Sequence, residues 1–220
     1  YDEKLHIPAG YSAKAILRWG DPIVAGAPAF DPQVRDAVAQ AGAEPLLYPL
    51  DLEGASPDDY AELADSLRAE LGHLDGVLHC AVEFKGLTPL EHTDPAAFAR
   101  VMHVNLTAPW WLSQACLPLL RQAQDAALVF ALDDLQRVGQ PYWGAYGIAQ
   151  HGLAAMVGML HAELASSSVR VSALQPGPMR TGLRSRAYAD DNDLQAREAT
   201  DYADACVTLL SSAGAAHRGQ

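Results

Sequence analysis

The chain has 220 residues, half of them apolar, and a formal net charge of −12. This length and composition predict a globular protein with a packed core. The negative charge excludes a nucleic-acid partner, because such a partner requires a basic face. The apolar runs are shorter than the roughly 18 residues of a membrane span, and the chain opens without a signal-peptide pattern. We therefore expect a cytoplasmic protein that does not enter a membrane.

The cysteines, Cys80, Cys116 and Cys206, are an odd number and lie far apart in the sequence. Two of them fall in apolar runs, which favours reduced core cysteines over a disulfide or metal framework. The eight histidines show no metal-ligand spacing. The sequence therefore predicts no metal site.

Helical and strand-like patterns alternate from about residue 33 onward. Apolar residues at helical spacing, with Asp-Pro or Ser-Pro starts and glycine stops, predict the helices. Short apolar runs predict buried strands between them. The expected helices cover residues 31–42, 56–72, 94–123, 143–165 and 199–213, and the expected strands cover residues 44–52, 74–82, 126–132 and 169–179.

This alternation predicts an α/β fold with three layers: a Rossmann-like, doubly wound parallel sheet covered by helices on both faces. Ligands bind such sheets at the carboxyl ends of the strands. Residues 1–32 differ, because they are rich in proline and glycine and contain one strand-like run, residues 13–19. We therefore expect an atypical or truncated first β-α-β unit. Residues 1–32 form an atypical segment and residues 33–220 the Rossmann-like domain, within one globular domain overall.

Several motifs stand at the ends of these strands and on the long helices. They are, in chain order, Asp51 in LDLEG, Cys80-Ala81 in LHCAV, Asn105 in VMHVNLTAPWW, Tyr146 in WGAYGIAQHG, and Pro176, Gly177 and Thr181 in QPGPMRT. Their order and spacing resemble the short-chain dehydrogenase/reductase family over about residues 33–191. Each motif is weak alone, and the series together is specific.

The resemblance implies an oxidoreductase that uses NAD or NADP, and it implies a role for each matching residue. Asp51 would contact the adenine of the cofactor, and Cys80-Ala81 would form the turn beside it. The Pro176-Gly177 turn and Thr181 would hold the nicotinamide. Tyr146 matches the catalytic tyrosine, and Asn105 matches the asparagine of the catalytic tetrad. A homodimer or homotetramer through the two long helices is also implied, with Trp110 and Trp111 in that interface rather than stacked on a ligand.

The departures from the family pattern fall on the chemistry. The family's glycine-rich phosphate-binding turn has no match, since Gly20 and Gly26 are followed by Pro28, which removes a backbone donor. The Asn-Ala-Gly turn ends in Val82, which places side-chain bulk beside the cofactor position. Asp133 stands where the family has its catalytic serine, and Gln150 stands where it has its lysine.

These replacements act on the proton chemistry of Tyr146. A phenol ordinarily titrates at about pH 10, and the family's lysine lowers that value. Gln150 supplies no charge, and an ionised Asp133 raises the pKa of the phenol and repels a developing oxyanion. Lys85 follows a strand at the correct end of the sheet, but the family pattern does not direct it to Tyr146. His151 is turned by about 100° around the helix from Gln150.

Structural interpretations stand beside the functional ones. Tyr146 is either a retained helix residue at an idle site or a working acid/base. Asn105 either serves the tetrad or satisfies a helix bend. Asp133 and Asp134 either form a cation or paired-carboxylate site or lie at a solvated loop entry.

The N-terminal 32 residues carry a second, weaker resemblance. The run GYSAKAILRWGDPIVAGAPAFD is similar to an early segment of PhoX-type, calcium-dependent alkaline phosphatases, without the metal-site sequence that would carry phosphatase activity. The alternative is that residues 13–19 fill the place of the family's first strand.

Three functions follow from these observations. The first is a short-chain dehydrogenase/reductase homologue impaired in the family's reaction. The second is a functioning NAD(P)-dependent oxidoreductase on a carbonyl or alcohol, with a rebuilt cofactor site. The third is a non-redox ligand-binding or lyase activity in the same cleft.

Overall fold

The computed structural model describes residues 14–19, 36, 39–40, 42–188 and 194–219. It divides into two compact units, Tyr1–Asp59 and Tyr60–Gln220. The boundary between these units falls after the second described strand, and the segment boundary expected at residue 32 stays a prediction.

Unit 1 contains a pair of parallel strands, β1 (Lys14–Trp19) and β2 (Glu44–Pro49), with Ile16 opposite Leu46. The strand predicted at residues 13–19 is therefore confirmed. Its parallel neighbour β2 leads to Asp51, and the interpretation that residues 13–19 fill the place of the family's first strand stays a prediction. Most of the helix expected at residues 31–42 and the Gly20–Pro28 run lie outside the described residues.

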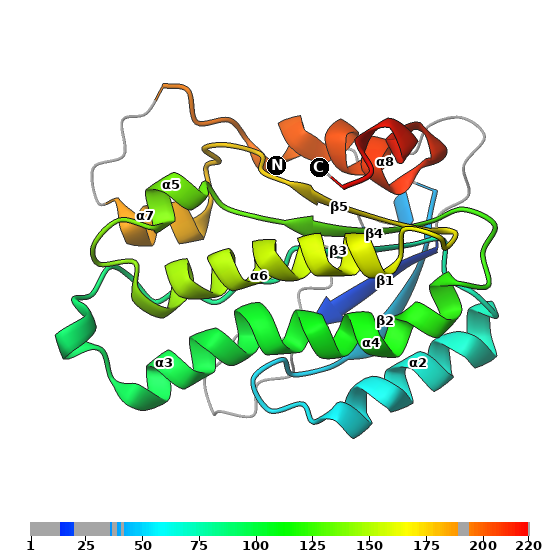
Figure 1. Ribbon diagram of the computed structural model, residues 1–220, viewed down its shortest axis with the longest axis horizontal. Helices are drawn as coiled ribbons and strands as arrows, with labels where there is room; N and C mark the ends of the chain where they lie inside the picture. Colours follow the sequence, from blue (N-terminus) through cyan, green and yellow to red (C-terminus); the bar gives the residue numbers. More distant parts are fainter. Residues whose placement is uncertain (1–13, 20–35, 37–38, 41, 189–193, 220) are drawn as a thin grey trace. The chain divides into compact units, whose positions relative to one another are not determined.

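Unit 2 is built on a parallel sheet of β3 (Gly76–His79), β4 (Ala126–Ala131) and β5 (Val169–Leu174), in the order β3-β4-β5. In the register, Leu128 lies opposite Val77 on one side and Val171 on the other. Figure 1 shows the three strands running side by side between two layers of helices. The parallel alternation expected from the sequence is confirmed here.

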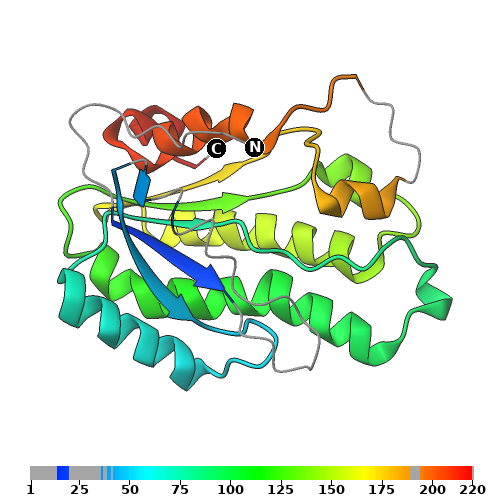
Figure 2. The ribbon, with the colours of Figure 1, turned by 180° about the vertical axis from the view of Figure 1, so that it is seen from behind.

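The longer helices of the described chain include those that cover the two faces of this sheet. They are α2 (Pro57–Leu71), α3 (Pro95–Met102), α4 (Ala108–Leu120), α6 (Gly144–Glu163) and α8 (Ala203–Leu210). Helices α4 and α6 lie on one face and α8 on the other, an arrangement also seen from behind in Figure 2. Among the described residues, none of the helices is both long and apolar enough to cross a membrane.

The core follows from the alternation of side chains along β4, whose residues are almost completely buried. Ala127 and Val129 point to one face and pack with Leu209 of α8. Leu128 and Phe130 point to the opposite face, because successive strand residues alternate. A strand that is buried on both sides explains why the run AALVFA is continuously apolar.

The helix expected over residues 94–123 is interrupted by a π-helical turn, His103–Thr107, between α3 and α4. Pro109 follows this turn and has no backbone N–H, so the helical hydrogen-bond ladder shifts there. Where the sequence predicted a bend near Pro109, the structure has one π-helical turn. Asn105 lies within this turn.

Short helices connect the main elements, and patterns of apolar residues did not predict most of them. They are η1 (Leu90–His92), α5 (Leu135–Val138), α7 (Gly182–Ala187), η3 (Ala199–Tyr202) and η4 (Ser212–His217). The helix expected over residues 199–213 is therefore three pieces, with α8 as the central one.

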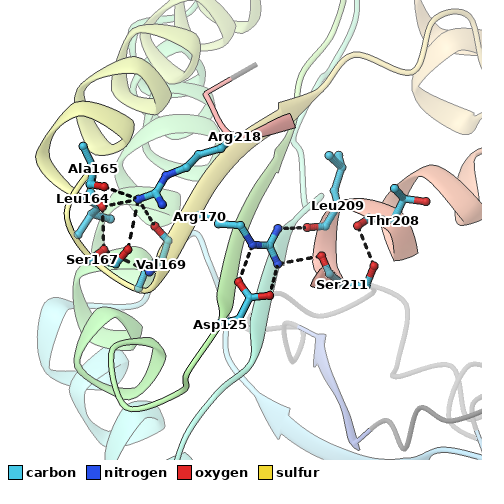
Figure 3. A network of polar contacts seen from close by, with 10 residues as sticks. All are labelled: Asp125, Leu164, Ala165, Ser167, Val169, Arg170, Thr208, Leu209, Ser211 and Arg218. Atoms are coloured by element: carbon cyan, nitrogen blue, oxygen red, sulfur yellow. Dashed lines mark hydrogen bonds and ion pairs between the residues drawn. The ribbon is translucent and has the colours of Figure 1, made fainter. Parts of the chain in front are cut away.

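Two arginines anchor the C-terminal elements to the sheet (Figure 3). Arg170 of β5 is 5% exposed, pairs with Asp125 at 2.7 Å and donates to the carbonyl oxygens of Leu209 and Ser211. Arg218 donates to carbonyl oxygens at the end of α6 and the start of β5, including those of Leu164 and Val169. The bonds to Leu164, Leu209 and Ser211 reach carbonyl groups at helix ends, which have no partner within the helix.

Candidate active site

A cleft of about 240 Å³ lies at the carboxyl ends of β3, β4 and β5, in unit 2. The sequence predicted a site at this edge of the sheet. The lining includes all of the predicted site residues except Asp51: Cys80, Ala81, Asn105, Asp133, Tyr146, Gln150, Pro176, Gly177 and Thr181. Residues far apart in the chain therefore meet in one place.

Tyr146 and Gln150 lie one turn apart on α6 and face the same side of that helix. The Tyr146 hydroxyl donates to Oδ2 of Asp133 at 3.0 Å, and Gln150 Oε1 accepts from the Asp133 backbone N–H at 3.0 Å. Asp133, which follows β4, is therefore held by both helix residues. Instead of a cation, the phenol has a carboxylate as its hydrogen-bond partner.

This arrangement determines the protonation of Tyr146. Burial raises the pKa of the Tyr146 phenol far above its ordinary value, and the negative charge and accepted hydrogen bond of Asp133 raise it further. The Arg137 guanidinium acts in the opposite direction with a smaller effect on that pKa. The phenol is therefore protonated near neutral pH and acts as a hydrogen-bond donor.

Asn105 is almost fully buried and makes two bonds to the backbone of one residue. Its Oδ1 accepts from the Glu83 N–H at 2.7 Å, and its Nδ2 donates to the Glu83 carbonyl at 2.8 Å. The side chain thus ties the π-helical turn to the loop after β3. We expected Asn105 to satisfy the helix bend, whereas both of its bonds reach Glu83 in the loop after β3.

Asp133 and Asp134 are joined by one hydrogen bond, from the Asp134 N–H to Oδ1 of Asp133 at 2.7 Å. Asp134 caps α5 by accepting from the backbone N–H groups of Gln136 and Arg137. Its Oδ2 also lies 3.8 Å from the Arg137 guanidinium. Both aspartates are half-buried and lie between β4 and α5.

The segment after β5 forms a turn beside the cleft. Gly177 has a φ of 86°, a conformation that favours glycine, and the neighbouring Pro178 carbonyl accepts from the Tyr202 hydroxyl at 3.3 Å. Thr181 caps α7 by accepting from the Arg184 N–H at 3.3 Å. The structure thus places Pro176, Gly177 and Thr181 at the mouth of the cleft.

The sequence did not predict the aromatic wall of the cleft. Trp143, Tyr146 and Tyr188 line it, and Phe84 packs behind them with its ring 5.0 Å from that of Tyr146. The rings of Trp143 and Tyr146 lie 5.7 Å apart. The spacing of Trp143 and Tyr146, one turn apart on the same helix, was a signal for part of this wall, but Phe84 and Tyr188 come from distant loops.

Three further residues considered in the sequence analysis, Lys85, His151 and Asp51, are not among the described lining residues. Lys85 is exposed. The His151 ring bonds the Gly147 carbonyl at 2.8 Å, away from Gln150's partners. Asp51 belongs to unit 1, where its carboxylate accepts from the Glu53 N–H at 3.0 Å. Val82 is 41% exposed and lines the cleft, so its side chain occupies space at the position where the family has glycine.

Comparisons with known proteins extend the resemblance along the chain. The family model described as enoyl-(acyl carrier protein) reductase matches residues 23–220. The match begins within the segment 1–32, so it supports dehydrogenase homology there and gives no support to the predicted PhoX-type resemblance. It also continues past residue 191, where the sequence motifs ended.

Individual relatives agree with this family. The chain is 30% identical over 162 residues to the Escherichia coli oxidoreductase YciK, covering 74% of this chain and 64% of that protein. It is 28% identical over 166 residues to the short chain dehydrogenase pigC of Monascus ruber, covering 73% of this chain and 55% of that one. The chain thus spans less than two thirds of the length of these curated relatives.

Solved structures match the fold. A short chain dehydrogenase from Pseudomonas syringae has a TM-score of 0.79 and 36% identity, covering 86% of this chain and 77% of that one. A short chain dehydrogenase from Escherichia coli CFT073, in complex with NADPH, has a TM-score of 0.82 and 27% identity, covering 93% and 82%. The Rossmann-like fold class predicted from the sequence is confirmed. The chain belongs to the short-chain dehydrogenase/reductase family of oxidoreductases.

Proposed function

We propose that this protein is a short-chain dehydrogenase/reductase homologue that does not carry out the family's tyrosine–lysine reaction. The observation that carries this proposal is the 3.0 Å hydrogen bond from the Tyr146 hydroxyl to Asp133. A working phenol must exchange a proton with the substrate near neutral pH. The Tyr146 hydroxyl already donates a hydrogen bond to the Asp133 carboxylate, and the negative charge of that carboxylate disfavours ionisation of the phenol.

Gln150 does not substitute for a lysine in this arrangement. Its side chain is 4% exposed and its oxygen is bonded to the Asp133 backbone, so it positions the carboxylate. The lysines of the chain are Lys4, Lys14 and Lys85. Lys85 is exposed, and Lys4 and the Lys14 side chain lie outside the described residues. Arg137 is therefore the described cation that acts on Tyr146, and its effect on the pKa is outweighed.

Asp133 also changes the site that would receive a substrate carbonyl. The serine of the family donates a hydrogen bond to the carbonyl oxygen, whereas an ionised carboxylate can only accept. Negative charge would develop on that oxygen in the transition state, and a carboxylate at the same place opposes it. Carbonyl reduction would therefore depend on a phenol of raised pKa, a weak proton donor, and on a carboxylate in place of the oxyanion stabiliser.

The test is the oxidation of NADPH and NADH by the protein in the presence of reactive aldehydes and diketones. We expect the wild-type rate to equal that of Tyr146→Phe, which keeps the ring and removes the hydroxyl. Turnover that disappears in Tyr146→Phe would overturn the proposal. The double variant Asp133→Ser, Gln150→Lys restores the family's residues at both positions, and NADPH turnover that appears only in this variant would assign the impairment to those two positions.

A second candidate is a functioning NAD(P)-dependent oxidoreductase on a carbonyl or alcohol. Its support is the similarity to a short chain dehydrogenase that binds NADPH, together with Pro176, Gly177 and Thr181 in the cleft. Bound NAD(P)H would supply a hydride, and these residues would hold its nicotinamide end. Saturable micromolar binding of NADPH, measured by fluorescence or calorimetry, would favour this candidate over the first.

We also propose a cytoplasmic homodimer or homotetramer formed through α4 and α6. Trp110 on α4 and Ile148 and Met159 on α6 are 49%, 47% and 63% exposed. Large apolar side chains exposed on two neighbouring helices are typical of a surface that another subunit covers. Light scattering of the purified protein measures the assembly directly.

A further inference from the structure

The cleft combines a carboxylate with a wall of aromatic rings, and this combination goes beyond an impaired dehydrogenase site. We propose that it binds a small organic cation, an amine or amidine on one ring or a short chain, with Asp133 as the counter-charge. The inference shares Asp133 and Tyr146 with the proposed function. Its readout is ligand binding rather than turnover, so each can fail without the other.

The negative charge of Asp133 has no cation among its described hydrogen-bond partners. Its Oδ1 accepts from the Asp134 backbone N–H at 2.7 Å, and its Oδ2 accepts from the Tyr146 hydroxyl at 3.0 Å. Both donors are neutral groups. A carboxylate has about four lone-pair positions, so capacity remains for a donor that arrives from the cleft.

The hydrogen bonds also fix the direction of the carboxylate. Gln150 holds the Asp133 backbone, and Tyr146 holds one carboxylate oxygen. Both helix residues are buried, at 4% exposed each. A charged group whose orientation is set by buried neighbours binds a ligand with little further loss of conformational entropy.

The contacts described for the two arginines of the lining, Arg137 and Arg184, are made to other groups. Arg137 lies 3.8 Å from Asp134, the neighbouring carboxylate, and these two charges offset each other. Arg184 lies over the Tyr188 ring, with its guanidinium 5.0 Å from the ring centre. An anionic ligand on these arginines is the opposing hypothesis, and it predicts the reverse charge preference.

The aromatic wall supplies the second half of the site. Trp143, Tyr146 and Tyr188 all line the cleft beside Asp133. An organic cation is attracted to the face of such a ring when it lies within about 6 Å of the centre. The Arg184 guanidinium already lies over the Tyr188 ring, so Trp143 and Tyr146, which are 7% and 4% exposed, are the rings that remain for a ligand.

The size of the cleft limits the ligand. Its volume of about 240 Å³ is below the range of about 300–1,000 Å³ that is typical of sites for drug-sized molecules. A ligand with one ring or a short chain fits this volume. The ligand class is therefore a compact amine or amidine.

The experiment uses calorimetry on the intact chain with a series of ligands matched in shape: benzamidine, benzamide and benzoate, with benzylamine and benzyl alcohol as a second pair. We expect saturable binding of benzamidine and benzylamine, at least tenfold tighter than binding of their neutral partners, and weaker binding still of benzoate. Equal binding of benzamidine and benzamide would overturn the proposal, as would a preference for benzoate.

Variants assign the charge preference to one residue. Asp133→Asn should weaken benzamidine binding at least tenfold and abolish the preference over benzamide. Asp75→Asn is the matched control, because Asp75 is exposed and precedes β3 at the opposite end of that strand from the cleft. Unchanged binding in Asp133→Asn, or an equal loss in Asp75→Asn, contradicts the proposal. If Asp133→Asn does not fold, the charge preference of the wild-type protein still decides it.

Discussion

At the scale of single residues, Asp133 is in contact with Tyr146, Gln150 and Asp134. It accepts from the Tyr146 hydroxyl, its backbone is held by Gln150, and its neighbour Asp134 caps α5. The sequence predicted that a carboxylate here would raise the pKa of the phenol, because that follows from like charge alone. It could not predict that Gln150 would bond to Asp133, since this contact depends on how β4 and α6 pack.

The raised pKa of Tyr146 predicts a dependence of stability on alkaline pH. An unfolded tyrosine loses its proton at about pH 10, whereas the folded phenol keeps its proton to higher pH. The folded state then binds more protons, so the free energy of unfolding falls as pH rises above that value. Below it, the stabilisation is fully present.

Urea denaturation at about pH 8 and about pH 10.5 measures this effect, because those values bracket the titration of an unfolded phenol. We expect the wild-type midpoint to fall more between the two than the midpoint of Tyr146→Phe. Equal falls in the two proteins would show that Tyr146 contributes no such linkage.

At the scale of elements, the long helices and buried strands of unit 2 were predicted because their apolar patterns are strong. The short helices were not, because α5 and α7 are held by local caps such as Asp134 and Thr181 rather than by periodicity. The π-helical turn His103–Thr107 was expected only as a bend. Its effect on Asn105 depends on a contact with Glu83 that sequence spacing does not reveal.

Helix α6 approaches α5 through Gly147. A Cβ added there would lie closer to the Val138 carbonyl oxygen than real Cβ atoms come to any atom. We therefore expect Gly147→Ala to lower the free energy of unfolding by about 1–3 kcal/mol, in the range of overpacking. Gly158→Ala on the same helix meets no atom within 4 Å. This control should raise stability by up to about 1 kcal/mol, because alanine favours the helix. Chemical denaturation checks both, and equal stability of the two variants would contradict the packing.

Arg170 is the described side chain that connects β5 to the end of α8 (Figure 3). Arg170→Met keeps the apolar stem and leaves Asp125 and two carbonyl groups without this donor. We expect a loss of about 2–3 kcal/mol in the free energy of unfolding. Asp125→Asn should cost less, about 1 kcal/mol, because the Asp125 side chain is 43% exposed. An Arg170→Met protein as stable as the wild type would show that this anchor is dispensable.

At the scale of the whole molecule, ancestry and activity are separate properties of this chain. The order of motifs from Asp51 to Thr181 predicted the family, and the family match and the fold confirm it. The departures at Asp133 and Gln150 lie in the same cleft as the retained residues. A family match depends on the whole pattern, whereas the proton chemistry depends on a few atoms around Tyr146.

Titration of Tyr146 in the intact protein measures the pKa of its phenol most directly. Tyrosine labelled with ¹³C at the ring carbon that bears the hydroxyl gives one NMR signal per residue, and Tyr146→Phe identifies the signal of Tyr146. We expect that signal to remain in its protonated form through about pH 10, the ordinary value for a phenol, and to titrate at lower pH in Asp133→Asn. A Tyr146 signal that titrates near neutral pH in the wild-type protein would contradict the proposed impairment.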